Sequence, residues 1–165
     1  MGSTLDTARL LNILNKISGF NLNKIEGMVF GLHNNDMIIS ANRIKIKGKL
    51  PDIFLKNDEF KKIQEMTALR GGQIVGYLKN KSAHFAPALS ACRLVEAITG
   101  DEKNIMPVSV LLEGEYELSN VCVGVPCLIG KNGIHKIIEL KLTNEESNKL
   151  RKVQEEFTVI KEIII

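Results

Sequence analysis

The chain has 165 residues, of which 44% are hydrophobic and 25% are charged. These values are typical of a globular protein, and the length is typical of one domain, so we expect residues 1–165 to form a single domain. A net charge of +3 does not indicate a nucleic-acid partner. Three cysteines without a Cys-x-x-Cys pair indicate neither a disulfide framework nor a metal site. With no secretory signal and no apolar run of about 18 residues, we expect a cytoplasmic protein without a membrane partner.

Residues 4–18 are predicted to form a helix, with Thr4 as its N-cap and Gly19 as its stop. Asp6 and Arg9 are three positions apart and project from neighbouring positions of that helix. On spacing alone, the favoured interpretation is an ion pair on the helix surface, because such pairs are common. The apolar stripe expected to face the core consists of Leu5, Ala8, Leu11, Leu14 and Ile17.

Residues 25–32 are predicted to form a buried strand, and residues 38–47 to continue as strand. His33 follows the first strand, on a turn rich in asparagine. The end of a strand is a place where a rigid element presents a side chain to a site. A lone histidine in this position is nevertheless more often structural or exposed than catalytic.

A stripe of cations alternates with two isoleucines over residues 43–49, at the end of the second of these strands and just beyond it. Its position on one face of a strand fits a solvated sheet edge protected by lysine better than a nucleic-acid surface, because no aromatic residue is interleaved. The cations are Arg43, Lys45, Lys47 and Lys49.

Two further helices are predicted over residues 58–79 and 82–99. The first is expected to break at Gly71-Gly72, since a glycine pair in a helical pattern marks a kink or a junction. A phosphate-binding loop is disfavoured there because no Gly-x-Gly-x-x-Gly or Lys-Ser/Thr pattern accompanies the pair. Ser82 is expected to cap the second helix. Its packed face is expected to consist of Ala88, Ala91, Cys92, Val95 and Ile98.

The remaining chain reads as an antiparallel meander followed by a helix. Strands are predicted over residues 106–113, 121–129 and 134–142, with Asn132-Gly133 as a hairpin turn. Thr143 and Glu146 form a capping box at the start of the terminal helix. Strands cluster in runs instead of alternating with helices, so the predicted class is α+β and no nucleotide-binding βαβ unit is visible.

Seven short motifs occur in order along nearly the whole chain. They are Leu5-Asp6-Thr7-Ala8-Arg9, Gly31-Leu32-His33, Gly71-Gly72-Gln73-Ile74-Val75, Ser82-Ala83-His84-Phe85-Ala86-Pro87-Ala88, Leu112-Glu113-Gly114-Glu115-Tyr116, Val123-Gly124-Val125-Pro126, and Gly130-Lys131-Asn132-Gly133 before Lys136-Ile137-Ile138-Glu139-Leu140. Together they resemble the C-terminal half of the NAD-dependent malate/lactate dehydrogenase family, and most closely its lactate-dehydrogenase-like malate dehydrogenases.

The resemblance implies roles for the matching residues. His33 would exchange a proton with the substrate hydroxyl and would be the residue of this chain that contacts the cofactor. Asp6 would hydrogen-bond the other ring nitrogen and fix the tautomer, and Arg9 would grip the substrate carboxylate with its planar fork. Ser82 and Ala83 fall where the family lines the substrate pocket.

The resemblance also implies partners. The substrate would be a small 2-hydroxy or 2-oxo dicarboxylic acid. The cofactor, NAD, would lie on a Rossmann domain that precedes this region in the family and is absent here, so we expect a truncated or split gene. The chain would assemble with copies of itself or with a separate nucleotide-binding half.

One motif departs from the family pattern. The family's Gly-Asp-Ser/Thr after the histidine is Asn34-Asn35-Asp36 here. Asparagine tolerates a left-handed backbone better than most residues, so Asn34 is an acceptable replacement for glycine. Asn35 removes a charge beside the site.

Three functions are compatible with these residues. The first is the catalytic half of a malate dehydrogenase, expected to be inactive alone. The second is a non-enzymatic remnant or oligomerisation module. The third is a related hydrolase or dehydrogenase on the same fold, for example an NAD-dependent glycosidase. It ranks last because the metal-binding cysteine and histidine motifs of those glycosidases have no match.

Overall fold

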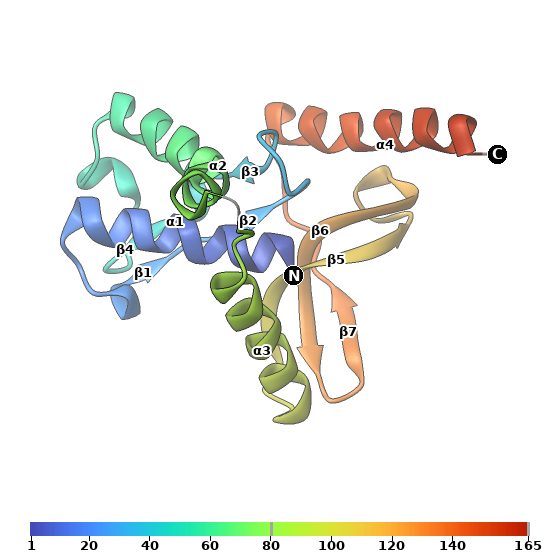
Figure 1. Ribbon diagram of the computed structural model, residues 1–165, viewed down its shortest axis with the longest axis horizontal. Helices are drawn as coiled ribbons and strands as arrows, with labels where there is room; N and C mark the ends of the chain where they lie inside the picture. Colours follow the sequence, from blue (N-terminus) through green and yellow to red (C-terminus); the bar gives the residue numbers. More distant parts are fainter. Residues whose placement is uncertain (80, 165) are drawn as a thin grey trace.

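The computed structural model describes residues 1–79 and 81–164, which form helices packed around small antiparallel sheets (Figure 1). The helices are α1 (Gly2–Ser18), α2 (Asn57–Leu78), α3 (Phe85–Thr99) and α4 (Asn144–Ile164). The strands are β1 (Ile25–Glu26), β2 (Val29–Phe30), β3 (Ile38–Ile39), β4 (Lys45–Ile46), β5 (Asn104–Glu113), β6 (Ser119–Gly130) and β7 (Gly133–Ile137). Every strand pair in the described ranges is antiparallel, which confirms the α+β class.

The largest sheet has the strand order β5-β6-β7. The predicted hairpin joins β6 to β7, where Gly130 pairs with Gly133 and Gly133 has a φ of 86°. The third strand ends at Ile137, five residues earlier than Leu142, where we predicted its end. The phenolic oxygen of Tyr116 explains the early end, because it donates to the Ile138 carbonyl and accepts from the Leu140 amide.

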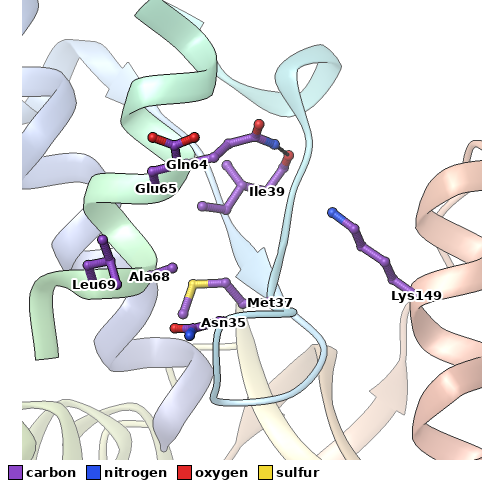
Figure 2. A pocket seen from close by; sticks show the side chains of 8 residues that line it. All are labelled: Asn35, Met37, Ile39, Gln64, Glu65, Ala68, Leu69 and Lys149. Carbon is purple, nitrogen blue, oxygen red and sulfur yellow. Dashed lines mark hydrogen bonds between the residues drawn. The ribbon is translucent and has the colours of Figure 1, made fainter. Parts of the chain in front are cut away.

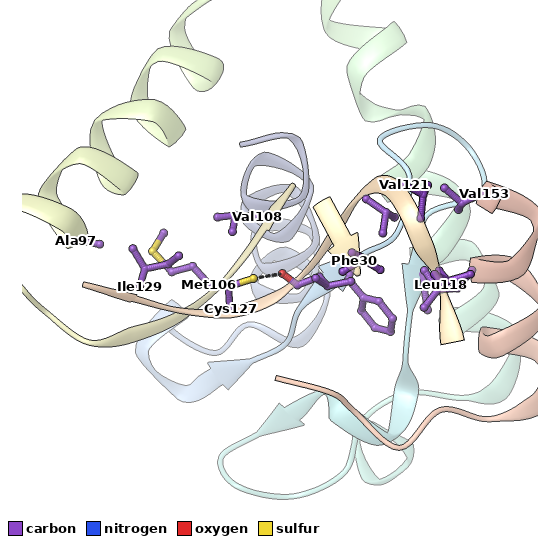
Figure 3. Close-up of a cluster of buried hydrophobic side chains, with 14 residues drawn as sticks. Phe30, Ala97, Met106, Val108, Leu118, Val121, Cys127, Ile129 and Val153 are labelled. Atoms are coloured by element: carbon purple, nitrogen blue, oxygen red, sulfur yellow. Dashed lines mark hydrogen bonds between the residues drawn. The ribbon is translucent and has the colours of Figure 1, made fainter. Parts of the chain in front are cut away.

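Two apolar clusters form the core. The first fills the space between the β5-β6 sheet, β2, α3 and α4 (Figure 3). Its members are Phe30, Ile38, Ala97, Met106, Val108, Leu112, Leu118, Val121, Val123, Val125, Cys127, Ile129, Leu150 and Val153. The second lies between α1, α2 and the short strands, and it consists of Leu10, Ile13, Leu14, Ile25, Val29, Met37, Ile39, Ile44, Ile46, Leu55 and Ile63. Each fully buried large side chain stabilises the fold by about 1.5–3 kcal/mol.

Helix α1 contacts α2, α3, β2 and β5, so it lies at the centre of the molecule. The helix was predicted, and Gly19 ends it with a left-handed φ of 71°. The N-cap prediction was wrong: the helix begins at Gly2, and the Thr4 hydroxyl donates to the Pro107 carbonyl on β5 instead. The predicted stripe was also rotated, because Ala8 and Ile17 are exposed while Leu10 and Ile13 are buried.

The segment from residue 25 to residue 47 differs from the two strands that we predicted. It forms two short strand pairs, β1 with β4 and β2 with β3, separated by turns and a 3-10 helix. The alternation of lysines and isoleucines does separate solvent from core, since Ile44 and Ile46 are fully buried and Lys45 and Lys49 are exposed. The Arg43 guanidinium donates a hydrogen bond to the Lys141 carbonyl.

The two middle helices also correct the predictions. Helix α2 runs unbroken through Gly71 and Gly72, so the predicted break is wrong. Helix α3 begins at Phe85, and Ser82 does not cap it. The face predicted to pack in α3 is largely exposed at Ala88, Ala91, Cys92 and Val95. The capping box of α4 is confirmed, because the Thr143 amide donates to Glu146 and the Glu146 amide donates to the Thr143 hydroxyl.

Candidate active site

The centre of the site is the buried carboxylate of Asp6, whose side chain is 1% exposed. Its Oδ1 accepts a hydrogen bond from Arg9 Nη1 at 2.9 Å. Its Oδ2 lies 2.5 Å from His33 Nδ1. A carboxylate only accepts, so Nδ1 is the donor of this short bond. One carboxylate therefore holds a guanidinium and an imidazole at the same time, and the structure brings together the three residues that the sequence singled out.

Packing between α1 and β2 places His33 beside Asp6. The Thr7 hydroxyl accepts from the Val29 amide at 2.9 Å and donates to the Val29 carbonyl at 3.4 Å. These two bonds fix the strand that leads to His33 against the helix that carries Asp6. Thr7 was not predicted to have a role, although a threonine hydroxyl on a helix can bond to the backbone of a neighbouring element.

Gly31 and Gly124 attach the same strand to the large sheet. The Gly31 amide donates to the Gly124 carbonyl at 2.7 Å, and the Gly124 amide donates back at 3.2 Å. A Cβ at Gly124 would lie 1.9 Å from the Ser3 hydroxyl oxygen and 3.0 Å from the Gly31 carbonyl oxygen. Only glycine permits this approach, which brings the start of α1 and the end of β2 onto β6.

The imidazole of His33 is half-exposed, with 50% of its side chain accessible. Because Nδ1 is engaged by Asp6, Nε2 is the nitrogen available to an incoming group. The ring borders a hollow of about 360 Å³ whose other walls include Leu5, Gly31 and Cys122. Gly2 lies against the ring, since a Cβ there would be 2.9 Å from His33 Cγ. The geometry therefore suits a proton donor or acceptor beside an open cavity.

The Arg9 side chain is 11% exposed and lies against α2 next to Gly71. Among the described residues, its Nε is the buried side-chain polar atom without a hydrogen-bond partner. A buried donor that lacks a partner costs free energy unless something else accepts from it. The guanidinium has five N–H groups in a fork that matches a carboxylate, and Asp6 accepts one of them.

The pocket-lining residues taken from the resemblance lie on the segment before α3. Ser82 is exposed, and its carbonyl accepts from His84 Nδ1 at 3.0 Å. Ala83 is half-buried. In the described part of the chain, no hydrogen bond joins Ser82 or Ala83 to Asp6, Arg9 or His33, and their place in a substrate pocket stays a prediction.

The asparagine-rich turn after His33 closes on itself, because the Asp36 amide donates to Asn34 Oδ1 at 2.8 Å. Asn35 lines a second hollow of about 260 Å³ between the turn, α2 and α4 (Figure 2). In that hollow Gln64 Nε2 donates to the Ile39 carbonyl at 3.1 Å, and Lys149 extends from α4. None of its lining residues belongs to the Asp6 group.

The cysteines and the other ionisable groups form no second centre in the described ranges. Burial raises the pKa of the Cys127 thiol to about 11, so it is an inert core residue. No group of three or more His, Cys, Asp or Glu side chains among the described residues is placed to hold a metal ion. No helix in the described residues is both long enough and apolar enough to span a bilayer.

Comparison with known proteins gives a consistent result over the whole chain. The family model of the lactate/malate dehydrogenase α/β C-terminal domain matches residues 3–164. The malate dehydrogenase of Pelodictyon phaeoclathratiforme is 40% identical over 152 residues, which are 92% of this chain and 49% of that protein. The malate dehydrogenase of Bacteroides thetaiotaomicron is 39% identical over 90% of this chain and 48% of its own length. The chain thus spans about half the length of these relatives.

Solved structures share the fold. Malate dehydrogenase from Cryptosporidium parvum superposes with a TM-score of 0.90 at 33% identity, over 94% of this chain and 51% of that one. Lactate dehydrogenase from Eimeria maxima, solved with NADH and oxamate, superposes with a TM-score of 0.93 at 32% identity, over 99% of this chain and 53% of that one.

The double role of Asp6 predicts a large effect of Asp6→Asn on stability. The amide cannot balance the buried charge of Arg9, so we expect the free energy of unfolding to fall by about 3 kcal/mol in urea denaturation. Asp36→Asn, on the exposed turn, is the matched control and should change it by less than about 0.5 kcal/mol. Equal stability of the two variants would contradict the central role of Asp6.

Proposed function

The chain belongs to the lactate/malate dehydrogenase family, and from this premise we propose that it is the substrate-binding and proton-transfer half of a 2-hydroxy-acid oxidoreductase. The observation that carries the proposal is the Asp6 carboxylate, which orients a guanidinium and an imidazole at once. These two groups are what a 2-hydroxy acid requires: one binds its carboxylate and the other accepts the proton of its hydroxyl.

Arg9 is proposed to bind the substrate carboxylate. The guanidinium supports this role, because Asp6 accepts from Nη1 and other N–H groups of the fork remain to donate to a second carboxylate. Paired N–H groups of a guanidinium bind a carboxylate in two parallel hydrogen bonds, which fixes the orientation of the substrate as well as its position. Lysine, a point charge on a flexible stem, would not fix that orientation.

His33 is proposed to exchange the proton. When a 2-hydroxy acid is oxidised, the carbon loses hydride and the hydroxyl oxygen loses a proton, and His33 Nε2 accepts that proton as a general base. The bond from Nδ1 to Asp6 holds the ring in the tautomer that leaves Nε2 unprotonated, and it stabilises the imidazolium that forms. In the reverse direction the same nitrogen returns the proton to the 2-oxo acid.

The hydride acceptor would be NAD, which supplies the redox chemistry when it is bound. The described residues contain no parallel strand pair and so no βαβ unit of the kind that holds a dinucleotide. This chain therefore contributes the residues that face the substrate, with His33 proposed as its contact to the cofactor. The cofactor itself would be held by a nucleotide-binding half.

Malate is the proposed substrate. The support comes from the relatives named malate dehydrogenase at 40% and 39% identity. The structural neighbours include both malate and lactate dehydrogenases, so the fold does not distinguish between the two acids.

We propose the cytoplasm as the compartment, because Cys92, Cys122 and Cys127 are all free thiols, which are typical of reducing surroundings.

Complementation tests the proposed function. The chain is mixed with the nucleotide-binding half of the Pelodictyon phaeoclathratiforme malate dehydrogenase, and NADH formation is measured with malate and with lactate. We expect the mixture to oxidise malate faster than lactate, and neither component to be active alone.

Substitutions in the complemented enzyme test the proposed roles of the two side chains. His33→Gln should lower kcat by about 100-fold or more, because the general base is lost. Arg9→Lys should lower kcat/KM by about 100-fold through misplaced substrate.

Asp36→Asn is the control for these variants and should retain the activity of the unmodified chain. A mixture that associates but oxidises neither acid would overturn the proposal. Activity that survives His33→Gln would exclude the proposed proton transfer even if the mixture is active.

One observation favours an oligomerisation module as the second candidate function. Apolar side chains project into solvent from α2 and α3, with Tyr77 82%, Phe85 79%, Leu89 72% and Val95 57% exposed. The small residues Ala88, Ala91 and Cys92 are exposed on α3 as well. Several large apolar side chains exposed on two consecutive helices favour a surface that is covered in an assembly. A second copy of the chain, or the nucleotide-binding half, would cover it.

Light scattering distinguishes these two partners. If the chain is an assembly module, it should form a defined oligomer alone at micromolar concentration, and Leu89→Asp should reduce the measured mass to that of one chain. Ile53→Asp, at a side chain 62% exposed outside α2 and α3, is the matched control and should leave the mass unchanged. A single-chain mass for the unmodified protein would exclude the self-assembling module.

A further inference from the structure

We propose that Gly71 is a positioning residue, whose missing side chain leaves the space in which the Arg9 guanidinium lies against α2. The consequence for substrate binding rests on the proposed function, whereas the clearance itself does not. The glycine pair predicted another role for Gly71, a helix break, which the structure excludes.

The geometry of the contact is specific to the guanidinium. A Cβ built on Gly71 would lie 3.2 Å from Arg9 Nη1, 3.3 Å from Nη2 and 3.5 Å from Cζ. Optimal contacts between heavy atoms of this kind are at roughly 3.5–4.0 Å. An alanine would therefore press on the forked end of the side chain, where the N–H groups for a carboxylate are located.

Arg9 has little freedom to move away. Its Nη1 is tied to Asp6 Oδ1 at 2.9 Å, and its side chain is 11% exposed. Asp6 is itself held by His33 at 2.5 Å. A displacement of the guanidinium by the added methyl group would lengthen the bond to Asp6 and turn the fork, and both changes reach the groups proposed to bind substrate.

Backbone conformation does not explain the glycine. Gly71 lies inside the unbroken helix α2, and it is not among the glycines with positive φ. Glycine is the weakest helix former apart from proline, so α2 would gain from an alanine if space allowed it. A Cβ at the neighbouring Gly72 would meet no heavy atom within 4 Å, so the pair offers a test site and a control one residue apart.

The experiment is a set of double-mutant cycles on the chain as it is, measured as urea denaturation midpoints. Gly72→Ala should raise the midpoint in the Arg9 protein and in Arg9→Ala, because it adds helix propensity and touches nothing. Gly71→Ala should raise the midpoint only in Arg9→Ala, where the guanidinium is gone. A midpoint raised equally by Gly71→Ala and Gly72→Ala in the Arg9 protein would overturn the clearance.

A second readout separates positioning from mere structure. Gly71→Ala should shift the NMR resonance of the Arg9 Nε–H, and Gly72→Ala should not. In the complemented enzyme, Gly71→Ala should raise KM for malate by about tenfold with kcat little changed, because a small displacement weakens carboxylate binding. If Gly71→Ala raises the urea midpoint only in Arg9→Ala but leaves KM unchanged, the positioning role is overturned. If no variant is active but the effect of Gly71→Ala on the midpoint still depends on Arg9, the proposed function is overturned. The proposal that Gly71 leaves space for Arg9 would then remain.

Discussion

The arrangement of this molecule depends on the burial of one carboxylate. Removing an ion from water is costly unless charged or hydrogen-bonding partners compensate it, and Asp6 is almost completely buried. The two partners come from different places in the chain. Arg9 lies one helical turn further along α1, whereas His33 follows β2 and reaches Asp6 only because the helix packs on that strand. The packing of α1 on β2 therefore brings His33 to Asp6, and the bonds from His33 and Arg9 in turn allow Asp6 to be buried.

Close contacts through glycine make that packing feasible. Gly31 and Gly124 let the strand before His33 approach β6 at backbone distance, and Gly71 lets α2 lie directly over Arg9. At Gly124 and Gly71, a Cβ would collide with or press on a neighbour. The positions of the three polar side chains therefore depend on the absence of a Cβ at these glycines. Residues without a functional group of their own thus help to set the geometry of the candidate site.

Signals that are local in the chain predicted the structure best. Gly19 ended the first helix, Gly133 made the hairpin turn, and Thr143 and Glu146 capped the last helix, because each of these effects involves residues only a few positions apart. The strands between residues 25 and 47 were misjudged because their lengths depend on distant partners, as at Gly31 with Gly124. Spacing alone suggested a surface ion pair for Asp6 and Arg9. The local sequence of α1 does not show that α2 and β2 cover this pair. The ordered motifs singled out Asp6, Arg9 and His33 as candidate site residues, but they did not predict the close contact between Gly71 and Arg9.

The tautomer of His33 shows whether Asp6 orients the imidazole as proposed. NMR of the ring nitrogens, at a pH at which the imidazole is neutral, shows which nitrogen carries the proton. Because a carboxylate only accepts, Asp6 should hold the proton on Nδ1 and leave Nε2 free, and Asp6→Ala should abolish that preference. A neutral ring protonated on Nε2 in the unmodified chain would contradict the account, since the nitrogen offered to substrate could not then accept a proton.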